Sequence, residues 1–188
     1  MQPLPMDLPD AYETTRLVVR VPRVGDGKSV HAGIVESLDA LHQWPESLPW
    51  AQTEPSEEGS EIFCRTAAAA FACRSDISML MFLRESQQFV GCLSLHPGNL
   101  SVPSFKIGYW CRSSLQRQAL TLEAVVGACG YARSRLRAQR LEIRCIRENM
   151  ASRKVAERAG FTLEAILSND CATPAGVPRD TCIYALVT

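Results

Sequence analysis

A short turn at residues 112–118 places basic and polar side chains between a strand-like segment and a long helix-like segment. The side chains available there for ligand contact are those of Arg112, Gln116, Arg117 and Gln118. Backbone N–H groups at the start of a helix lack intrahelical partners and carry partial positive charge, which favours a phosphate or pyrophosphate. The turn therefore predicts an anion site, although basic residues also occur in ordinary surface loops.

Three segments around this turn carry a more specific pattern. Residues 107–110 read Ile-Gly-Tyr-Trp, residues 116–120 read Gln-Arg-Gln-Ala-Leu, and residues 149–161 open on Asn-Met-Ala-Ser and close on Glu-Arg-Ala-Gly-Phe. Residues 49–51, Pro-Trp-Ala, add a shorter match. Together these segments resemble the acyl-CoA-dependent N-acetyltransferases of the GNAT superfamily, and most closely their RimJ/RimL-type branch. The resemblance covers nearly the whole chain.

The resemblance implies an α/β (α+β) GNAT fold and acetyl-CoA as cosubstrate, without a metal. The acetyl group would pass by direct attack to a primary amine, either a protein N-terminus or a small molecule. The strand backbone would pair with the pantetheine arm, and the turn would hold the pyrophosphate. The implied coenzyme contacts are Ile107, Gly108, Tyr109, Trp110, Gln116, Arg117, Gln118, Ala119, Leu120, Asn149 and Ser152. Asn149 could equally act only as a helix N-cap, and Trp110 only as a packing residue.

Four positions depart from the family pattern. Arg117 and Ala119 replace two glycines of the coenzyme loop, where glycine lets the backbone approach a pyrophosphate. Ala119 would be a mild substitute if its φ were negative. Lys106 stands where many superfamily members carry a glutamate base, and Ala156 where many carry a tyrosine acid. These departures keep a second interpretation open, a non-catalytic acyl-CoA-binding or partner-binding module with the same fold.

Amide formation needs a group that removes a proton from the amine and a group that helps the thiolate to leave. His96 is the first candidate base, because it ends a strand beside the expected site and histidine titrates near neutrality. Glu58, with Glu57 and Glu61 in the same helix, is the second, although a solvated first helical turn explains these acids as well. The resemblance implies that Ser152 donates a proton to the departing sulfur.

The elements that must position these residues follow from hydrophobic periodicity and turn residues. Strands are predicted at 16–21, 77–83, 89–95, 105–110, 140–146, 161–166 and 180–187, and helices at 29–44, 56–73, 119–136 and 149–159. The predicted order is β-α-α-β-β-β-α-β-α-β-β around one mixed, mostly antiparallel sheet. Residues 1–14 are proline-rich and predict a flexible arm, so residues 15–188 form a single domain. Residues 168–179 are predicted as a loop.

Composition limits the other classes of function. The formal net charge is zero, which gives no reason to expect nucleic-acid or membrane binding. No segment resembles a membrane span or a signal peptide, which predicts a cytoplasmic protein, with a homodimer as an option. The eight cysteines lack C-x-x-C spacing, so structural thiols are expected rather than a metal site. Cys92 and Cys111 stay of interest because their strands lie nearest the site.

Overall fold

The computed structural model describes residues 7–99 and 101–187 and contains one eight-stranded sheet in the order β1-β2-β3-β4-β5-β6-β8-β7. Its strands are β1 Ala11–Glu13, β2 Leu17–Arg20, β3 Ile77–Leu83, β4 Phe89–Pro97, β5 Ser104–Cys111, β6 Arg140–Ile146, β7 Thr162–Ala172 and β8 Pro178–Val187. The helices are α1 Gly27–Leu41, α2 Glu57–Ala72, α3 Leu120–Leu136 and α4 Met150–Arg158, with 3-10 turns η1 Pro49–Gln52 and η2 Ser113–Leu115. Every strand pair is antiparallel except β5–β6, so the predicted fold class is confirmed.

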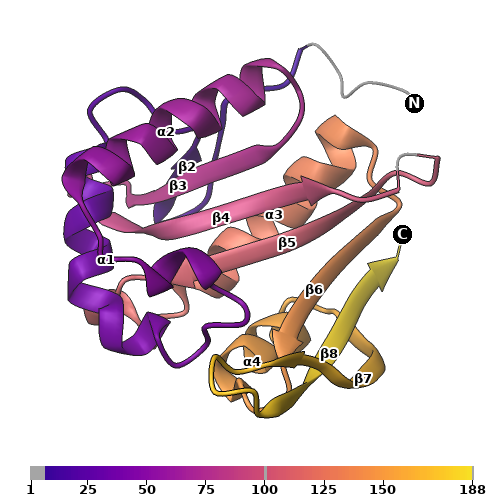
Figure 1. Ribbon diagram of the computed structural model, residues 1–188. Helices are drawn as coiled ribbons and strands as arrows, with labels where there is room; N and C mark the ends of the chain where they lie inside the picture. The colour runs from indigo at the N-terminus through magenta and orange to yellow at the C-terminus, as the bar shows by residue number, and fades with distance from the viewer. Residues whose placement is uncertain (1–6, 100, 188) are drawn as a thin grey trace.

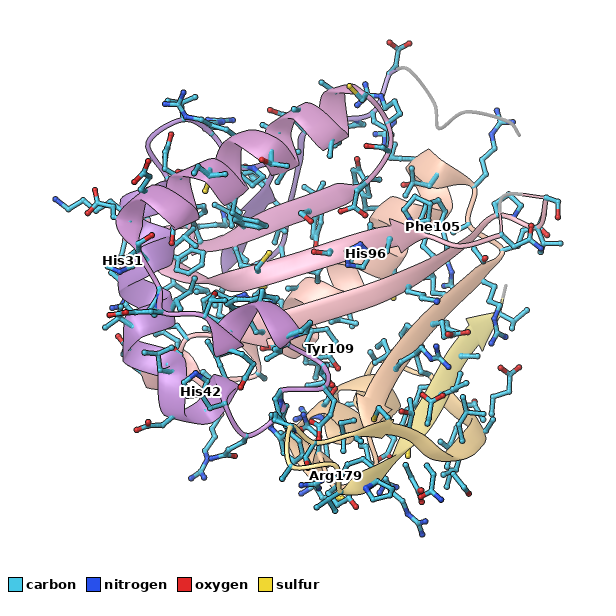
Figure 2. All side chains as sticks on the ribbon, in the orientation of Figure 1. His31, His42, His96, Phe105, Tyr109 and Arg179 are labelled. Carbon is cyan, nitrogen blue, oxygen red and sulfur yellow. The ribbon has the colours of Figure 1, made fainter. Side chains whose placement is uncertain are left out.

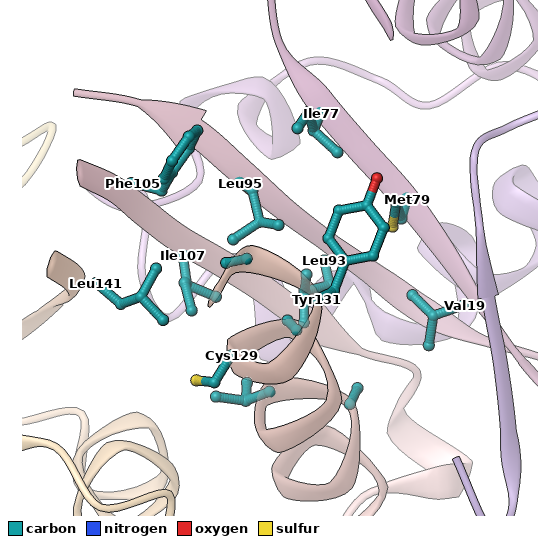
Figure 3. Packing of buried hydrophobic residues seen from close by; sticks show 14 of the residues in the cluster. Val19, Ile77, Met79, Leu93, Leu95, Phe105, Ile107, Cys129, Tyr131 and Leu141 are labelled. Carbon is teal, nitrogen blue, oxygen red and sulfur yellow. The ribbon is translucent and has the colours of Figure 1, made fainter. Parts of the chain in front are cut away.

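Helices cover both faces of the sheet, with α1 and α2 on one side and α3 on the other (Figure 1). Leu80 and Phe82 of β3 join the apolar cluster beneath α1 and α2, whereas Met79 and Met81 join the larger cluster around α3. Figure 3 shows Tyr131 of α3 and its apolar neighbours against the strands. Because side chains alternate between two covered faces, β3 is apolar except at Ser78.

The parallel pair β5–β6 holds together over a short stretch. Its register runs only from Ser104 opposite Arg140 to Lys106 opposite Glu142, while β5 stays paired with β4 as far as Cys111. Beyond that stretch the two strands diverge, as Figure 1 shows. Backbone groups of β5 on the side towards β6 therefore have no sheet partner from about Gly108 onward, which leaves an edge for an extended ligand.

The predicted flexible arm is wrong over the part that the structure describes. Leu8 is buried, and β1 pairs with β2 through Tyr12 opposite Val19. The Tyr12 hydroxyl also donates a hydrogen bond of 2.8 Å to the Ala124 carbonyl in α3. A three-residue strand is too short to show a period-2 pattern, which is why the sequence predicts no strand there. Residues 1–6 lie outside the described residues.

The predicted loop at 168–179 is also wrong over most of its length. Strands β7 and β8 extend into it as a hairpin, with Cys171 opposite Arg179. The connecting turn is closed by Gly176 N–H, which donates to the Thr173 carbonyl at 2.8 Å. The proline and glycine residues thus mark one tight turn and not a long loop. Among the residues that the structure describes, no helix is long and apolar enough to cross a membrane.

Candidate functional site

The loop that leads into α3 has an unusual backbone. Arg117 and Ala119 have φ angles of 61° and 59°, so both adopt the left-handed conformation that glycine adopts most easily. A β-carbon in this region costs roughly 1–2 kcal/mol per residue. The condition under which Ala119 would be a mild substitute, a negative φ, therefore does not hold. The loop keeps a glycine-type conformation without glycine.

Contacts to α1 hold the start of this loop. Glu36 of α1 accepts hydrogen bonds from Arg112 Nε at 2.6 Å and from the Ser114 N–H at 2.9 Å. Ser37 Oγ accepts a third from the Ser113 N–H at 3.0 Å. Burial alone would raise the pKa of the Glu36 carboxyl, but the hydrogen bonds from Ser114 and Arg112 outweigh it and lower that pKa. Glu36 is therefore a carboxylate that fixes the loop on α1.

A cavity of about 550 Å³ opens between the diverging strands β5 and β6, at the N-terminal ends of α3 and α4. All residues predicted to contact the coenzyme line it, with the exception of Gln118. The Gln118 side-chain amide instead donates to the Ser114 carbonyl at 3.4 Å, and the backbone carbonyl of Gln118 accepts a hydrogen bond from Arg16. The geometry therefore brings the predicted segments to one place and turns Gln118 away from it.

The charge of this cavity has a single sign. Four cationic side chains, Arg117, Arg144, Lys154 and Arg158, line it, and no aspartate or glutamate does. Arg144 has a carboxylate neighbour, Glu142, at 3.7 Å. Within residues 7–99 and 101–187, the other three cations have no ion-pair partner. Such a lining suits a ligand with several phosphate charges.

The start of α4 forms one wall of the cavity. Asn149 Oδ1 accepts the Ser152 N–H at 3.0 Å, so Asn149 is the N-cap that the sequence allowed. The Tyr109 hydroxyl lies 3.0 Å from Ser152 Oγ and donates to the Ser152 carbonyl at 3.1 Å. Burial raises the pKa of Tyr109, only partly offset by the bond to Ser152. Two protonated hydroxyls therefore meet where β5 faces α4.

A second cavity, of about 530 Å³, lies on the opposite side of β5, under η1 and the first turns of α2. It shares Ser47, Leu48, Gly108, Tyr109 and Trp110 with the first cavity. His96 lines only this second cavity. The two cavities thus meet at the middle of β5.

His96 has a carboxylate partner that sequence reasoning missed. Its Nδ1 lies 2.6 Å from Asp76 Oδ1, and Figure 2 shows the ring on β4 beside the strand that carries Tyr109. Asp76 Oδ2 accepts from Ser78 Oγ at 3.1 Å, and Ser78 Oγ lies 3.0 Å from Ser94 Oγ. A β-carbon on Gly108 would lie 3.8 Å from His96 Nε2, so Nε2 faces β5. With the proton on Nδ1, the free lone pair of Nε2 points towards the border between the cavities.

The acids predicted as alternative bases do not line either cavity. Ser56 Oγ caps α2 by accepting the Gly59 N–H at 3.0 Å, and Gly59, Ser60 and Phe63 face the second cavity. Because Gly59, Ser60 and Phe63 share one face of α2, Glu57 and Glu58 lie on other faces of the helix and line neither cavity. Glu61 accepts from the Gly25 and Gly27 N–H groups at the start of α1. Glu58 is therefore not among the residues that the structure brings to either cavity.

Three thiols line the cavities, those of Cys92, Cys111 and Cys145, and none is poised as a nucleophile. Burial raises the pKa of Cys92 to about 12 and that of Cys145 to about 11, and burial also raises the pKa of Cys111. The thiolate is the reactive form, so all three groups are held in the unreactive state. All eight cysteines are free. Among the residues that the structure describes, no three His, Cys, Asp or Glu side chains gather in a way that could hold a metal ion.

Comparison with known proteins agrees with this geometry. A family model described as "Acetyltransferase (GNAT) domain" matches residues 16–162. No curated protein matches the sequence significantly.

Solved structures resemble the chain over almost its whole length. One is RimL, a ribosomal L7/L12 alpha-N-protein acetyltransferase in complex with coenzyme A, at 23% identity, a TM-score of 0.82 and coverage of 99% of this chain and 98% of that one. The microcin C7 self-immunity acetyltransferase MccE, in complex with acetyl-CoA and AMP, has 20% identity, a TM-score of 0.82 and 93% coverage of both chains. An acetyltransferase from Salmonella typhimurium that modifies the N-terminal serine of L7/L12 has 22% identity and a TM-score of 0.78, covering 93% of this chain and 96% of that one.

Proposed function

The chain belongs to the GNAT acetyltransferase family, and on that premise we propose that it transfers the acetyl group of acetyl-CoA directly to a primary amine. The acceptor is a peptide N-terminus or a small molecule. The observation that carries the proposal is the cavity of about 550 Å³, which has four cationic side chains and no carboxylate in its lining. The RimL and MccE structures, which contain coenzyme A and acetyl-CoA, support the same assignment.

Each part of the cavity fits one part of the coenzyme. The pyrophosphate would lie at the start of α3, where the N–H groups of the loop and Arg117 face it. The pantetheine arm would extend along the unpaired edge of β5, from Gly108 to Cys111. Lys154 and Arg158 of α4 would meet the remaining phosphate charge. The acetyl group then lies at the middle of β5, next to the second cavity.

His96 takes the role of base in this proposal. Its Nε2 accepts a proton from the attacking amine, the amine nitrogen bonds to the thioester carbonyl carbon, and the carbon–sulfur bond breaks. Ser152 Oγ–H passes its proton to the departing thiolate and takes one from water, and the protonated His96 returns its proton to water, so that amide, free thiol and the starting protein remain. The Tyr109 hydroxyl contacts Ser152 Oγ. Asp76 holds His96 in the productive tautomer. Because Cys92, Cys111 and Cys145 are held as thiols, direct attack is favoured over an acetyl-enzyme intermediate.

The second candidate function is an acyl-CoA-binding module without turnover. The left-handed Arg117 and Ala119, together with Lys106 in the position of the family glutamate, favour it. A sensor would bind acetyl-CoA and leave it intact. An enzyme releases free thiol when an amine is added.

Calorimetric titration with acetyl-CoA, with desulfo-CoA and adenosine as controls, tests the first step. We expect saturable binding of both coenzyme forms and much weaker binding of adenosine. Release of free thiol in the presence of amines then tests turnover. No binding at millimolar acetyl-CoA would refute the proposal, and binding without thiol release for any amine would favour the sensor.

The base is tested separately with His96→Gln. Loss of general base catalysis should lower kcat roughly 100-fold or more, with acetyl-CoA affinity unchanged. His31→Gln is the matched control, because His31 of α1 lines neither cavity (Figure 2). Equal activity of the two variants would show that His96 is not the base.

A further inference from the structure

The second cavity has the size and position of a binding site for the amine. Its volume of about 530 Å³ falls in the range that small-molecule sites occupy, roughly 300–1,000 Å³. His96 and Gly108 lie in its lining, so an amine there would reach both the base and the acetyl group. The other side chains that line this cavity therefore indicate the chemical class of the acceptor. This step rests on the function proposed above.

Aromatic rings dominate the outer part of this lining. Trp50, Phe63 and Trp110 come from η1, α2 and β5. The rings of Trp50 and Trp110 lie 5.9 Å apart at 48°, while Trp50 and Phe63 are 43% and 39% exposed. A flat, apolar group that covers exposed aromatic side chains in a cavity removes the largest apolar area from water and therefore binds most favourably.

Charge in the cavity is sparse. Among residues 7–99 and 101–187, Glu54 is its single acidic lining residue, and no lysine or arginine lines it. A polyamine carries several ammonium groups and would need several carboxylates to replace their hydration. An anionic acceptor would find no cation. A lining with one carboxylate and no lysine or arginine matches a compound with one amine on an uncharged body.

We propose that the acceptor of this protein is a monoamine on an apolar, ring-bearing skeleton, held between the aromatic side chains of Trp50, Phe63 and Trp110. The ring covers these side chains, and the amine lies towards His96 and Gly108. Polyamines and peptides that begin with a small residue are then poor acceptors, because neither covers the aromatic wall.

An acceptor panel at saturating acetyl-CoA tests this inference through the rate of thiol release. The probes are phenethylamine and tryptamine as ring-bearing monoamines, hexylamine as an apolar amine without a ring, spermidine, and a peptide that begins with serine. We expect kcat/KM for the two ring-bearing amines to exceed that for every other probe by roughly tenfold or more. A higher kcat/KM for spermidine, hexylamine or the peptide would overturn the inference and leave the proposed function standing.

Two variants connect the preference to the cavity. Trp50→Ala and Phe63→Ala should each raise KM for phenethylamine roughly tenfold and leave acetyl-CoA affinity unchanged. Ile62→Ala is the control, because Ile62 is 57% exposed on the same helix as Phe63 and lines neither cavity. Equal effects of Ile62→Ala and Phe63→Ala would contradict a ring site at this place.

Failure of the proposed function gives a different result. If acetyl-CoA binds and no amine causes release of free thiol, catalysis is absent. Calorimetric titration of the acetyl-CoA complex with phenethylamine then tests the ring-binding site by itself. Saturable binding that Trp50→Ala weakens supports a ring-binding site in a protein without turnover. The absence of binding refutes the site.

Discussion

The left-handed backbone at Ala119 predicts that glycine at this position stabilises the protein. Ala119 has a φ of 59° directly before α3, where a β-carbon costs about 1–2 kcal/mol. Glycine removes that cost, but its greater conformational freedom stabilises the unfolded chain and lowers the free energy of unfolding by about 0.4–1 kcal/mol. Ala119→Gly should therefore raise the free energy of unfolding by roughly 1 kcal/mol.

Urea denaturation followed by circular dichroism measures the change. For a chain of this size, about 1 kcal/mol corresponds to a rise in Tm of about 2–4 °C. The slope of the free energy of unfolding against urea concentration should not change. The matched control is Ala69→Gly, the same chemical change at an exposed position inside α2. Glycine in a helix interior should lower the free energy of unfolding by about 1 kcal/mol. The two variants are thus expected to shift stability in opposite directions.

The reasoning would be refuted if both variants lost stability by similar amounts. That result would mean that Ala119 does not occupy the left-handed region in solution. The same variant also informs on the site, because Ala119 lines the cation-lined cavity. Calorimetry should show acetyl-CoA affinity for Ala119→Gly at least equal to that of the parent, since glycine allows the closest approach of backbone to phosphate.

Three further predictions concern catalysis, coenzyme binding and pH. Asp76→Asn should lower kcat roughly tenfold or more without changing acetyl-CoA affinity, because the amide no longer fixes the proton on Nδ1 of His96; a loss of affinity instead would place Asp76 in the coenzyme site. Lys154→Ala and Arg158→Ala should each weaken acetyl-CoA binding in calorimetry, less so at high salt, and equal weakening of adenosine binding would contradict phosphate contacts. For Glu123, burial alone raises the carboxyl pKa, but hydrogen bonds from the β1–β2 segment outweigh it and hold that pKa below its ordinary value. Its stabilising contribution is thus complete above the unfolded carboxyl pKa of about 4.3 and is lost as pH falls through the lower folded value. Urea denaturation should therefore show that Glu123→Gln loses less stability than the parent between about pH 6 and about pH 3. An equal loss would argue against a stabilising ion pair between Glu123 and Arg16, whose Nε lies 2.6 Å from Glu123 Oε2.

Much of the fold could be predicted because the local signals agree with the tertiary structure. Strands β3 and β6 have the predicted bounds. β3 is mostly apolar and β6 alternates charged and apolar residues, and charged or turn residues end both segments. Helix α2 begins within one residue of its predicted start, because Ser56 directly precedes it and accepts the Gly59 N–H as its cap. The short β1 was not predicted, because its three residues gain stability from pairing with β2 and not from their own pattern.

The partner of His96 was missed for a different reason. Asp76 and His96 lie on either side of the β3–β4 hairpin, and no local pattern connects them. The hairpin register supplies the link, because Ile77 opposite Leu95 puts the next pair outward at Asp76 and His96. Counting residues outward from a predicted hairpin would therefore have found this pair. Glu58 was misplaced because helical phase, and not proximity in sequence, decides which side chains of α2 face the cavity.

The loop that leads into α3 keeps a left-handed backbone although it lacks the residue type that favours one. Arg117 and Ala119 keep left-handed φ angles although neither is glycine. The hydrogen bonds of the Glu36 carboxylate hold one end of the loop on α1, and the burial of Leu120 at the start of α3 holds the other. The chain between two fixed ends must turn in the space available, so tertiary contacts offset the local cost. Arg117 then adds a charge that glycine lacks, in a cavity whose lining is otherwise suited to phosphate. The loss of both glycines is thus compatible with coenzyme binding, because the loop conformation is held by its neighbours.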